Sequence, residues 1–186
     1  QVESNIAGNN NFGVFSIDSA GVWTYTMNSA HNEFVAGQTY TDSYTAKAAD
    51  GTTQLITVTI TGTNDAAVIG GTNTASLTET NVALTASGTL TITDADSAAT
   101  FSAQTDTAGS NGYGKFSLTS AGVWSYTMNS AQNQFVAGSD YTDSFTAVSA
   151  DGTSQTITVT LTGSNDAAVI GGVSTASLTE SDTAQT

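Results

Sequence analysis

Hydrophobic and polar residues alternate with a period of two along most of the chain. In residues 56–61, and again in residues 157–162, Ile, Val or Leu alternates with Thr. Successive side chains of a β-strand point to opposite faces of the sheet, so each run predicts a strand with one buried and one solvated face. The pattern therefore predicts an all-β protein.

Short polar segments separate the alternating runs. The Asp-Gly pairs at 50–51 and 151–152 each lie between two such runs, which predicts hairpins because glycine accepts a positive φ. Residues 28–36 and 129–137 break the alternation, begin with Asn-Ser and end just before Gly. We expect one short helical turn in each of these two segments.

The chain repeats itself with a period of 101 residues, so that Gly13 and Trp23 return as Gly114 and Trp124. This period is that of a whole domain rather than of a solenoid unit. Tandem copies of a domain favour functions that scale with copy number, such as reach and spacing. The predicted domains are a first repeat that lacks its N-terminal strands (1–67), a complete second repeat (68–168) and the opening strand of a third (169–186).

The second repeat contains enough alternating runs for a complete domain. Its strands are expected near residues 75–79, 87–94, 99–106, 113–119, 122–129, 140–150 and 154–163. Short strands with regular turns over about 100 residues predict a Greek-key β-sandwich of the immunoglobulin or cadherin type. We expect Trp23 and Trp124 to fill the centres of their domains, since clustered aromatic residues are usually part of the core.

The first predicted repeat lacks its opening strands and the third consists of one strand, and two explanations fit this pattern. The chain is a window from a longer array, or residues 169–186 of one molecule complete the first domain of the next by strand addition. A sandwich without its first strands exposes a bare sheet edge, which is prone to association.

The charge balance is strongly acidic, with 16 Asp and Glu against two Lys and Arg and a net charge of −14. Such a chain repels nucleic acids and anionic membranes, because these partners need Lys and Arg to neutralise phosphate. No apolar run reaches the length of a membrane span. Neither nucleic acid binding nor membrane insertion is expected, whereas cations are attracted.

Catalytic chemistry has few candidate residues. His31 is the only histidine, its counterpart in the second copy is Gln132, and the chain has no cysteine. Neither a Ser-His-Asp triad nor a His- or Cys-based zinc site can therefore exist in both copies. We expect that the protein is not an enzyme.

Oxygen-bearing side chains gather around the predicted domain boundary. The first set is Asn64, Asp65, Glu79, Asp94 and Asp96, and the second is Asn165, Asp166 and Glu180. Oxygen donors without His or Cys favour Ca²⁺ over transition metals. Asn-Asp and Asp-x-Asp are equally typical of turns. The residues alone leave a calcium site and a set of turns as open alternatives.

Several segments together resemble the VCBS repeat family. They are Gly62-Thr63-Asn64-Asp65-Ala66, Ser76-Leu77-Thr78-Glu79, Gly88 to Asp96, Gly122-Val123-Trp124-Ser125-Tyr126 and Asp151-Gly152-Thr153. The boundary also resembles the calcium-binding linker of cadherins. The resemblance implies Ca²⁺ ligands at Asn64, Asp65, Glu79, Asp94 and Asp96, with Asp50 as a weaker candidate.

The family resemblance implies a place and a role. VCBS repeats form arrays in large bacterial surface adhesins and biofilm proteins, many of them secreted in the RTX manner, so an extracellular or cell-surface location is expected. One departure is Ala67, and likewise Ala168, where the family usually has proline. Losing this proline is expected to loosen the linker.

The sequence thus predicts a structural extender whose joints are stiffened by Ca²⁺. Its expected partners are neighbouring repeats of the same chain or of identical chains. Two alternatives remain: a self-assembling filament subunit joined by exchange of residues 169–186, and a module that binds surface glycans.

Overall fold

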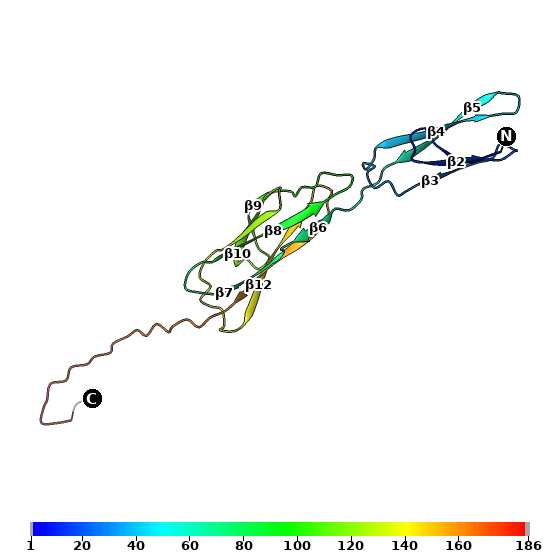
Figure 1. Cartoon of the computed structure of the whole chain (residues 1–186). Helices are drawn as coiled ribbons and strands as arrows, with labels where there is room; N and C mark the ends of the chain where they lie inside the picture. Colours follow the sequence, from blue (N-terminus) through cyan, green and yellow to red (C-terminus); the bar gives the residue numbers. More distant parts are fainter. Residues whose placement is uncertain (1, 185–186) are drawn as a thin grey trace.

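The computed structural model describes residues 2–184, so residues 1, 185 and 186 of the predicted first and third segments lie outside the described part. The described residues form strands and no helix, which confirms the all-β prediction. Two groups of strands lie end to end (Figure 1). The first unit holds β1–β5, the second unit holds β6–β13, and residues 63–67 link them. The boundaries of the predicted domains stay a prediction.

The second unit is a sandwich of two sheets. The strand order is β6-β8-β11-β10-β9 in one sheet and β12-β13-β7 in the other. β7 runs parallel to β13, with Leu77 opposite Leu161, while the other pairs are antiparallel. The strands are β6 (Val68–Gly71), β7 (Thr74–Thr78), β8 (Thr85–Thr93), β9 (Gln104–Ala108), β10 (Gly114–Leu118), β11 (Val123–Met128), β12 (Asp140–Val148) and β13 (Ser154–Thr162).

The core of the second unit lies between its sheets and follows the alternation of the sequence. Trp124 and Tyr126 of β11 are buried, and so are Ile157, Val159 and Leu161 of β13. The residues between them in β11 are exposed. The Trp124 indole N–H donates to the carbonyl of Thr72, at 2.7 Å. This bond satisfies the one polar atom of the largest core side chain.

The first unit contains a smaller set of strands. β1 (Glu3–Ala7), β2 (Gly13–Ile17) and β3 (Trp23–Met27) form one sheet, and β4 (Thr39–Lys47) and β5 (Thr53–Thr61) form the other. Displaced by 101 residues, these match β9 to β13. The described part of the first unit has no counterpart of β6, β7 or β8.

The burial of Trp23 differs from the prediction. Trp23 is 44% exposed, whereas its counterpart Trp124 is fully buried. In the second unit β8 lies beside β11, and Gly88 of β8 is so close to the Trp124 ring that an added Cβ would stand 2.7 Å from it. The expectation that Trp23 fills a core is wrong, because no strand covers the equivalent side of β3 in the described residues.

The predicted helical turns over 28–36 and 129–137 are wrong. Both segments form turns and bends. His31 and Gln132 have φ values of 52° and 59°, and such left-handed residues end a helix. The Phe34 N–H donates to the carbonyl of His31 at 2.9 Å, which closes a tight turn instead.

Two strand predictions also need correction. The strand expected at 99–106 is β9, which begins only at Gln104, while Phe101 makes an isolated bridge to Ser149. β6 was not predicted, because its sequence Val-Ile-Gly-Gly is too short to display alternation.

The tail, residues 163–184, contains no strand and extends away from the second unit (Figure 1). Its apolar side chains at Val169, Ile170 and Val173 are almost fully exposed.

Candidate metal centre at the joint between the units

The joint consists of linker residues 63–67 and two turns of the second unit, 94–97 and 149–153. The Asp65 N–H donates to a carboxylate oxygen of Asp96, at 3.3 Å. The Ala67 N–H and the Asn64 side-chain amide donate to Asp151, at 3.0 and 3.3 Å. The linker is thus tied through backbone and amide donors to two carboxylates of the second unit.

The Asp-x-Asp pair sits where β8 ends. One oxygen of Asp94 accepts from the amides of Asp96 and Ser97, at 3.0 and 2.7 Å. These bonds form a turn of the kind that Asp-x-Asp sequences commonly make. The other oxygen of Asp94 and one oxygen of Asp96 are buried and have no hydrogen-bond partner. A buried carboxylate oxygen without a partner is costly, so this pair is the part of the joint best suited to a cation.

Asp151 was missed in the sequence analysis, although its counterpart Asp50 was named. Its carboxylate accepts from the hydroxyls of Ser149 and Thr153 and from the amides of Thr153 and Ala67. The Ser149 hydroxyl, followed by these other donors, holds the pKa of Asp151 well below its ordinary value. The repeat was the signal that could have found it, because Asp151 occupies the position of Asp50 in the second copy.

Glu79 lies at the opposite end of the second unit from Asp94 and Asp96. Its N–H donates to the carbonyl of Thr162, at 2.8 Å, where β13 ends. β8 then returns along the sandwich before Asp94 is reached. The structure therefore does not bring Glu79 together with Asn64, Asp65, Asp94 and Asp96.

Glu79 belongs to a second acidic group, at the exit of the second unit. One carboxylate oxygen accepts from the Ser164 hydroxyl at 2.8 Å, and the other is buried without a partner. Both carboxylate oxygens of Asp166 are likewise buried and unpartnered. Asn165 is exposed beside them, and Glu180 is exposed in the tail.

Asp50 lies in the exposed β4–β5 turn of the first unit, away from the joint. It accepts from the Thr52 N–H at 2.9 Å, and this backbone bond is the main cause that lowers the pKa of Asp50.

The chemical type of the side chains at the joint suits Ca²⁺, but the carboxylates are not gathered around one point. The available side-chain ligand atoms are oxygens, which hard cations prefer. Within residues 2–184, however, no three His, Cys, Asp or Glu side chains converge closely enough to hold a metal ion. The carboxylates among the predicted ligands fall mainly into two acidic groups, one at each end of the second unit.

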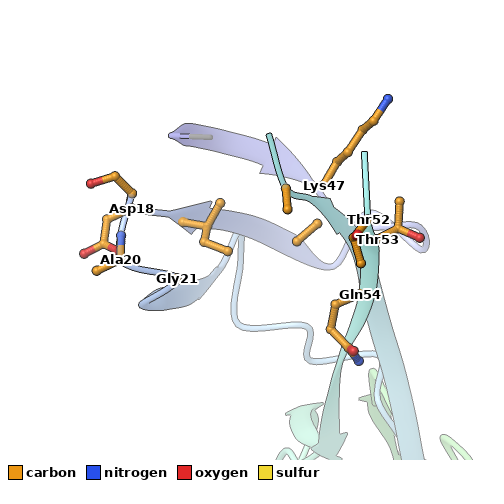
Figure 2. A pocket seen from close by; sticks show the side chains of 11 residues that line it. Asp18, Ala20, Gly21, Lys47, Thr52, Thr53 and Gln54 are labelled. Atoms are coloured by element: carbon orange, nitrogen blue, oxygen red, sulfur yellow. The ribbon is translucent and has the colours of Figure 1, made fainter. Parts of the chain in front are cut away.

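A separate pocket of about 360 Å³ opens in the first unit, between the β2–β3 turn and the β4–β5 hairpin (Figure 2). Ser19, Gly21 and Ala48 are among its lining residues. In the second unit Phe101 fills the corresponding place: its N–H donates to the Ser120 carbonyl at 3.0 Å, and its ring lies against Gly122.

A two-sheet sandwich with a parallel β7–β13 pair and an acidic joint defines a repeat of the cadherin-like class. Residues 64–163, more than half of the chain, match the family model described as bacterial cadherin-like domain, so the chain belongs to this family. No curated protein matched the chain.

Domains of this family are typically extracellular and generally serve as structural or adhesive modules rather than enzymes. None of the described residues belongs to a helix long and apolar enough to cross a membrane.

Proposed function

We propose that the chain is an extender segment of a large secreted bacterial surface adhesin or biofilm protein, and that Ca²⁺ stiffens the joints between its repeats. The VCBS-like motifs, the end-to-end placement of the units and the net charge of −14 support this role. The observation that carries the calcium part is the pair of buried, unpartnered oxygens on Asp94 and Asp96, where the linker enters the second unit.

The repeat supports a joint built from the two acidic groups of neighbouring units. Asp94, Asp96 and Asp151 lie at the entrance of the second unit, and Glu79, Asn165 and Asp166 lie at its exit. In an array of such units, the exit group of each unit would face the entrance group of the next. Each complete joint would then combine a Glu, an Asn-Asp pair and an Asp-x-Asp pair around Ca²⁺.

The chain's own residues prepare this role without the ion. The bonds from Asp65 and Ala67 to the second unit hold the linker against the carboxylates, and bound Ca²⁺ would supply the positive charge that offsets their repulsion. Extracellular calcium sites bind at about 10⁻⁴ to 10⁻³ M. Joints of this kind would be stiff in calcium-rich fluid and relaxed in chelator.

Small-angle scattering with Ca²⁺ and with chelator tests the proposal, together with a calcium titration. We expect a longer maximum dimension and a narrower range of shapes in Ca²⁺. Asp94→Asn with Asp96→Asn should abolish the response, whereas Asp106→Asn, an exposed carboxylate on β9, should retain it. Identical scattering in both buffers, with no calcium uptake, would refute the calcium part.

A further inference from the structure

The β9–β10 turn, residues 109–113, connects two strands of one sheet and packs against a buried carboxylate of the other sheet. The N–H groups of Asn111 and Gly114 donate to Asp143 of β12, at 2.8 and 3.0 Å. A Cβ atom added at Gly109 would stand 2.2 Å from the same carboxylate. The turn therefore has little freedom to move while the second unit is folded.

This turn contains the one Asn-Gly pair of the sequence, Asn111-Gly112. An asparagine followed by glycine is prone to deamidation, because glycine has no side chain to hinder its own backbone nitrogen. The Gly112 nitrogen attacks the side-chain carbonyl carbon of Asn111, and the bond from that carbon to the amide nitrogen breaks. Ammonia leaves with the Gly112 proton. Water then opens the cyclic imide, and residue 111 becomes aspartate or isoaspartate.

Both reacting groups have other partners in the folded turn. The Asn111 side-chain amide donates to the carbonyl of Thr142, at 2.6 Å. The Gly112 N–H donates to the carbonyl of Gly109, at 3.0 Å. Attack requires the nitrogen to lose its proton and the side chain to turn toward it, so both bonds must break first. Because Asn111 and Gly112 are exposed, these bonds rather than exclusion of water restrain the reaction.

We propose that Asn111 is a deamidation site, which the folded second unit keeps unreactive and which reacts when the β9–β10 turn opens. This goes beyond the proposed spacer role, because it limits how long a unit that opens repeatedly keeps its fold.

The product of the reaction does not suit the closed turn. A carboxylate at position 111 has no N–H for the Thr142 carbonyl, and it adds a negative charge next to Asp143, which is fully buried. Isoaspartate also lengthens the backbone of the turn by a methylene group. Either product therefore favours the open turn over the closed one.

Opening the turn would uncover the edge strand β12. This strand is the outermost of its sheet. The turn covers its outer edge through Asn111, which donates to Thr142, and through the Ser110 N–H, which donates to the carbonyl of Ser144 at 2.9 Å. An uncovered strand edge is prone to pair with other chains. Deamidation would thus change a covered edge into an open one.

The first unit provides an internal comparison. Asn10-Asn11 stand where the second unit has Asn111-Gly112. The Asn10 side-chain amide donates to the carbonyl of Thr41, at 2.7 Å, as Asn111 does to Thr142. Asn11 has a φ of 58°, close to the 71° of Gly112. The first unit therefore builds the same turn, but the side chain of Asn11 hinders the attack.

Peptide mapping by mass spectrometry tests the site in the full chain, kept at mildly alkaline pH with and without guanidinium chloride. We expect Asn111 to deamidate at least about tenfold more slowly in the folded chain, because only the minor open state reacts. Asn10 in the same denatured samples should react more slowly than Asn111. Equal rates at Asn111 with and without denaturant would overturn the restraint by the fold. An Asn111 that stays intact in denaturant would overturn the site.

Two variants separate the chemistry from the restraint. Gly112→Asn copies the first unit, and an added Cβ there meets no atom within 4 Å, so it should slow the reaction in denaturant. Asp143→Asn removes an acceptor that holds the turn and should speed the reaction in the folded chain without changing the rate in denaturant. Asp140→Asn, exposed on the same strand, is the matched control and should change neither rate. No acceleration in Asp143→Asn would contradict the proposed role of the turn.

Asn111→Asp reproduces one product and tests its consequence. Hydrogen exchange of β12 should become about two- to tenfold faster, the factor that corresponds to the loss of one such hydrogen bond. Asn133→Asp adds the same charge to an exposed position of the same unit and should leave this exchange unchanged. Exchange of β12 that is equal in both variants would show that deamidation does not loosen the edge.

Discussion

The two units carry closely similar residues, yet they bury them differently. Trp124 and Met128 of the second unit are 0% and 2% exposed, whereas Trp23 and Met27 of the first are 44% and 37% exposed. β11, which bears Trp124 and Met128, pairs with β10 and β8, whereas β3, which bears Trp23 and Met27, pairs only with β2 among the described strands. Alternation along a strand decides which face a residue takes, and the neighbouring strands decide whether that face is buried.

One aspartate carboxylate is buried to the same extent in the two units. Asp42 and Asp143 are both fully buried. Asp42 accepts from the amides of Asn10, Phe12 and Gly13 and from the Tyr25 hydroxyl. Burial alone would raise the pKa of Asp42, but the Asn10 amide and the Tyr25 hydroxyl outweigh it and lower the pKa. Asp143 accepts equivalent bonds from Asn111, Gly114 and Tyr126. This network needs only the strands that both units contain.

The largest expected difference is in the free energy of unfolding when each tryptophan is removed. Trp124→Ala should destabilise the second unit by about 3–5 kcal/mol, the usual cost of removing a buried aromatic side chain. Trp23→Ala should cost the first unit less than about half of that, because Trp23 already contacts solvent. Hydrogen exchange of β13 and β5 peptides during denaturant titration measures each loss. Equal losses would contradict the difference in burial.

The next effect should be the same in both units. Asp143→Asn and Asp42→Asn each turn one acceptor oxygen into an amide donor and leave a buried N–H without a partner, at about 1–3 kcal/mol. Hydrogen exchange on the same peptides provides the comparison. Asp106→Asn, on the surface of β9, is the control and should change little. A loss confined to the second unit would mean that the network depends on β8 after all.

Alkaline pH should lower the free energy of unfolding of both units, by less than the aspartate substitutions do. Burial, then the hydrogen bond to Asp42, raises the pKa of Tyr25 to about 12. Burial, then the charge of Asp143, raises the pKa of Tyr126 well above its ordinary value. The raised pKa values favour the neutral folded form, so this stability is complete below pH 10 and is lost as the pH rises through the folded values.

Denaturation midpoints between pH 9 and pH 12 check the alkaline prediction. Tyr126→Phe should flatten the pH dependence of the second unit while leaving that of the first. An unchanged profile in this variant would assign the effect to other groups.

The smallest effect concerns the linker rather than either unit. Ala67→Pro removes the N–H that donates to Asp151, and losing such a bond costs about 0.5–1.5 kcal/mol. Protection of the 149–153 turn against hydrogen exchange should fall, while the unfolding of both units stays the same. Ala66→Ser, an exposed neighbour that keeps its N–H, is the matched control. Undiminished protection in Ala67→Pro would show that this bond does not hold the linker.

The sequence was sufficient to predict the strands and much of the core. Val159 and Leu161 were assigned to the inner face by alternation alone, and both are buried. Trp23 was misjudged because its burial depends on strands distant in the sequence. The helical turns were misjudged because Asn-Ser is typical of both caps and bends, and only the left-handed φ of His31 and Gln132 decides between them.

The candidate site was predictable in its residue types but not in its grouping. Glu79 and Asp94 are near in sequence, yet β8 carries the chain the length of the sandwich between them. Asp151 is far from Asp65 in sequence, yet it receives the linker's hydrogen bonds. Only the topology of the sheets indicates which end of the sandwich each carboxylate occupies. The proline missing at Ala67 was expected to loosen the linker, but the N–H that alanine retains makes a bond that proline could not.

The parallel pairing of β7 with β13 has a mechanical consequence. The chain enters the second unit through β6, continues directly into β7 and leaves the unit from β13. Tension that reaches β7 therefore pulls β7 and β13 past each other lengthwise, because the two strands run parallel. Their backbone bonds then share the load across the whole ladder and must break together, whereas a pull across the strands would open them one at a time. The unit is oriented to resist drag along its long axis.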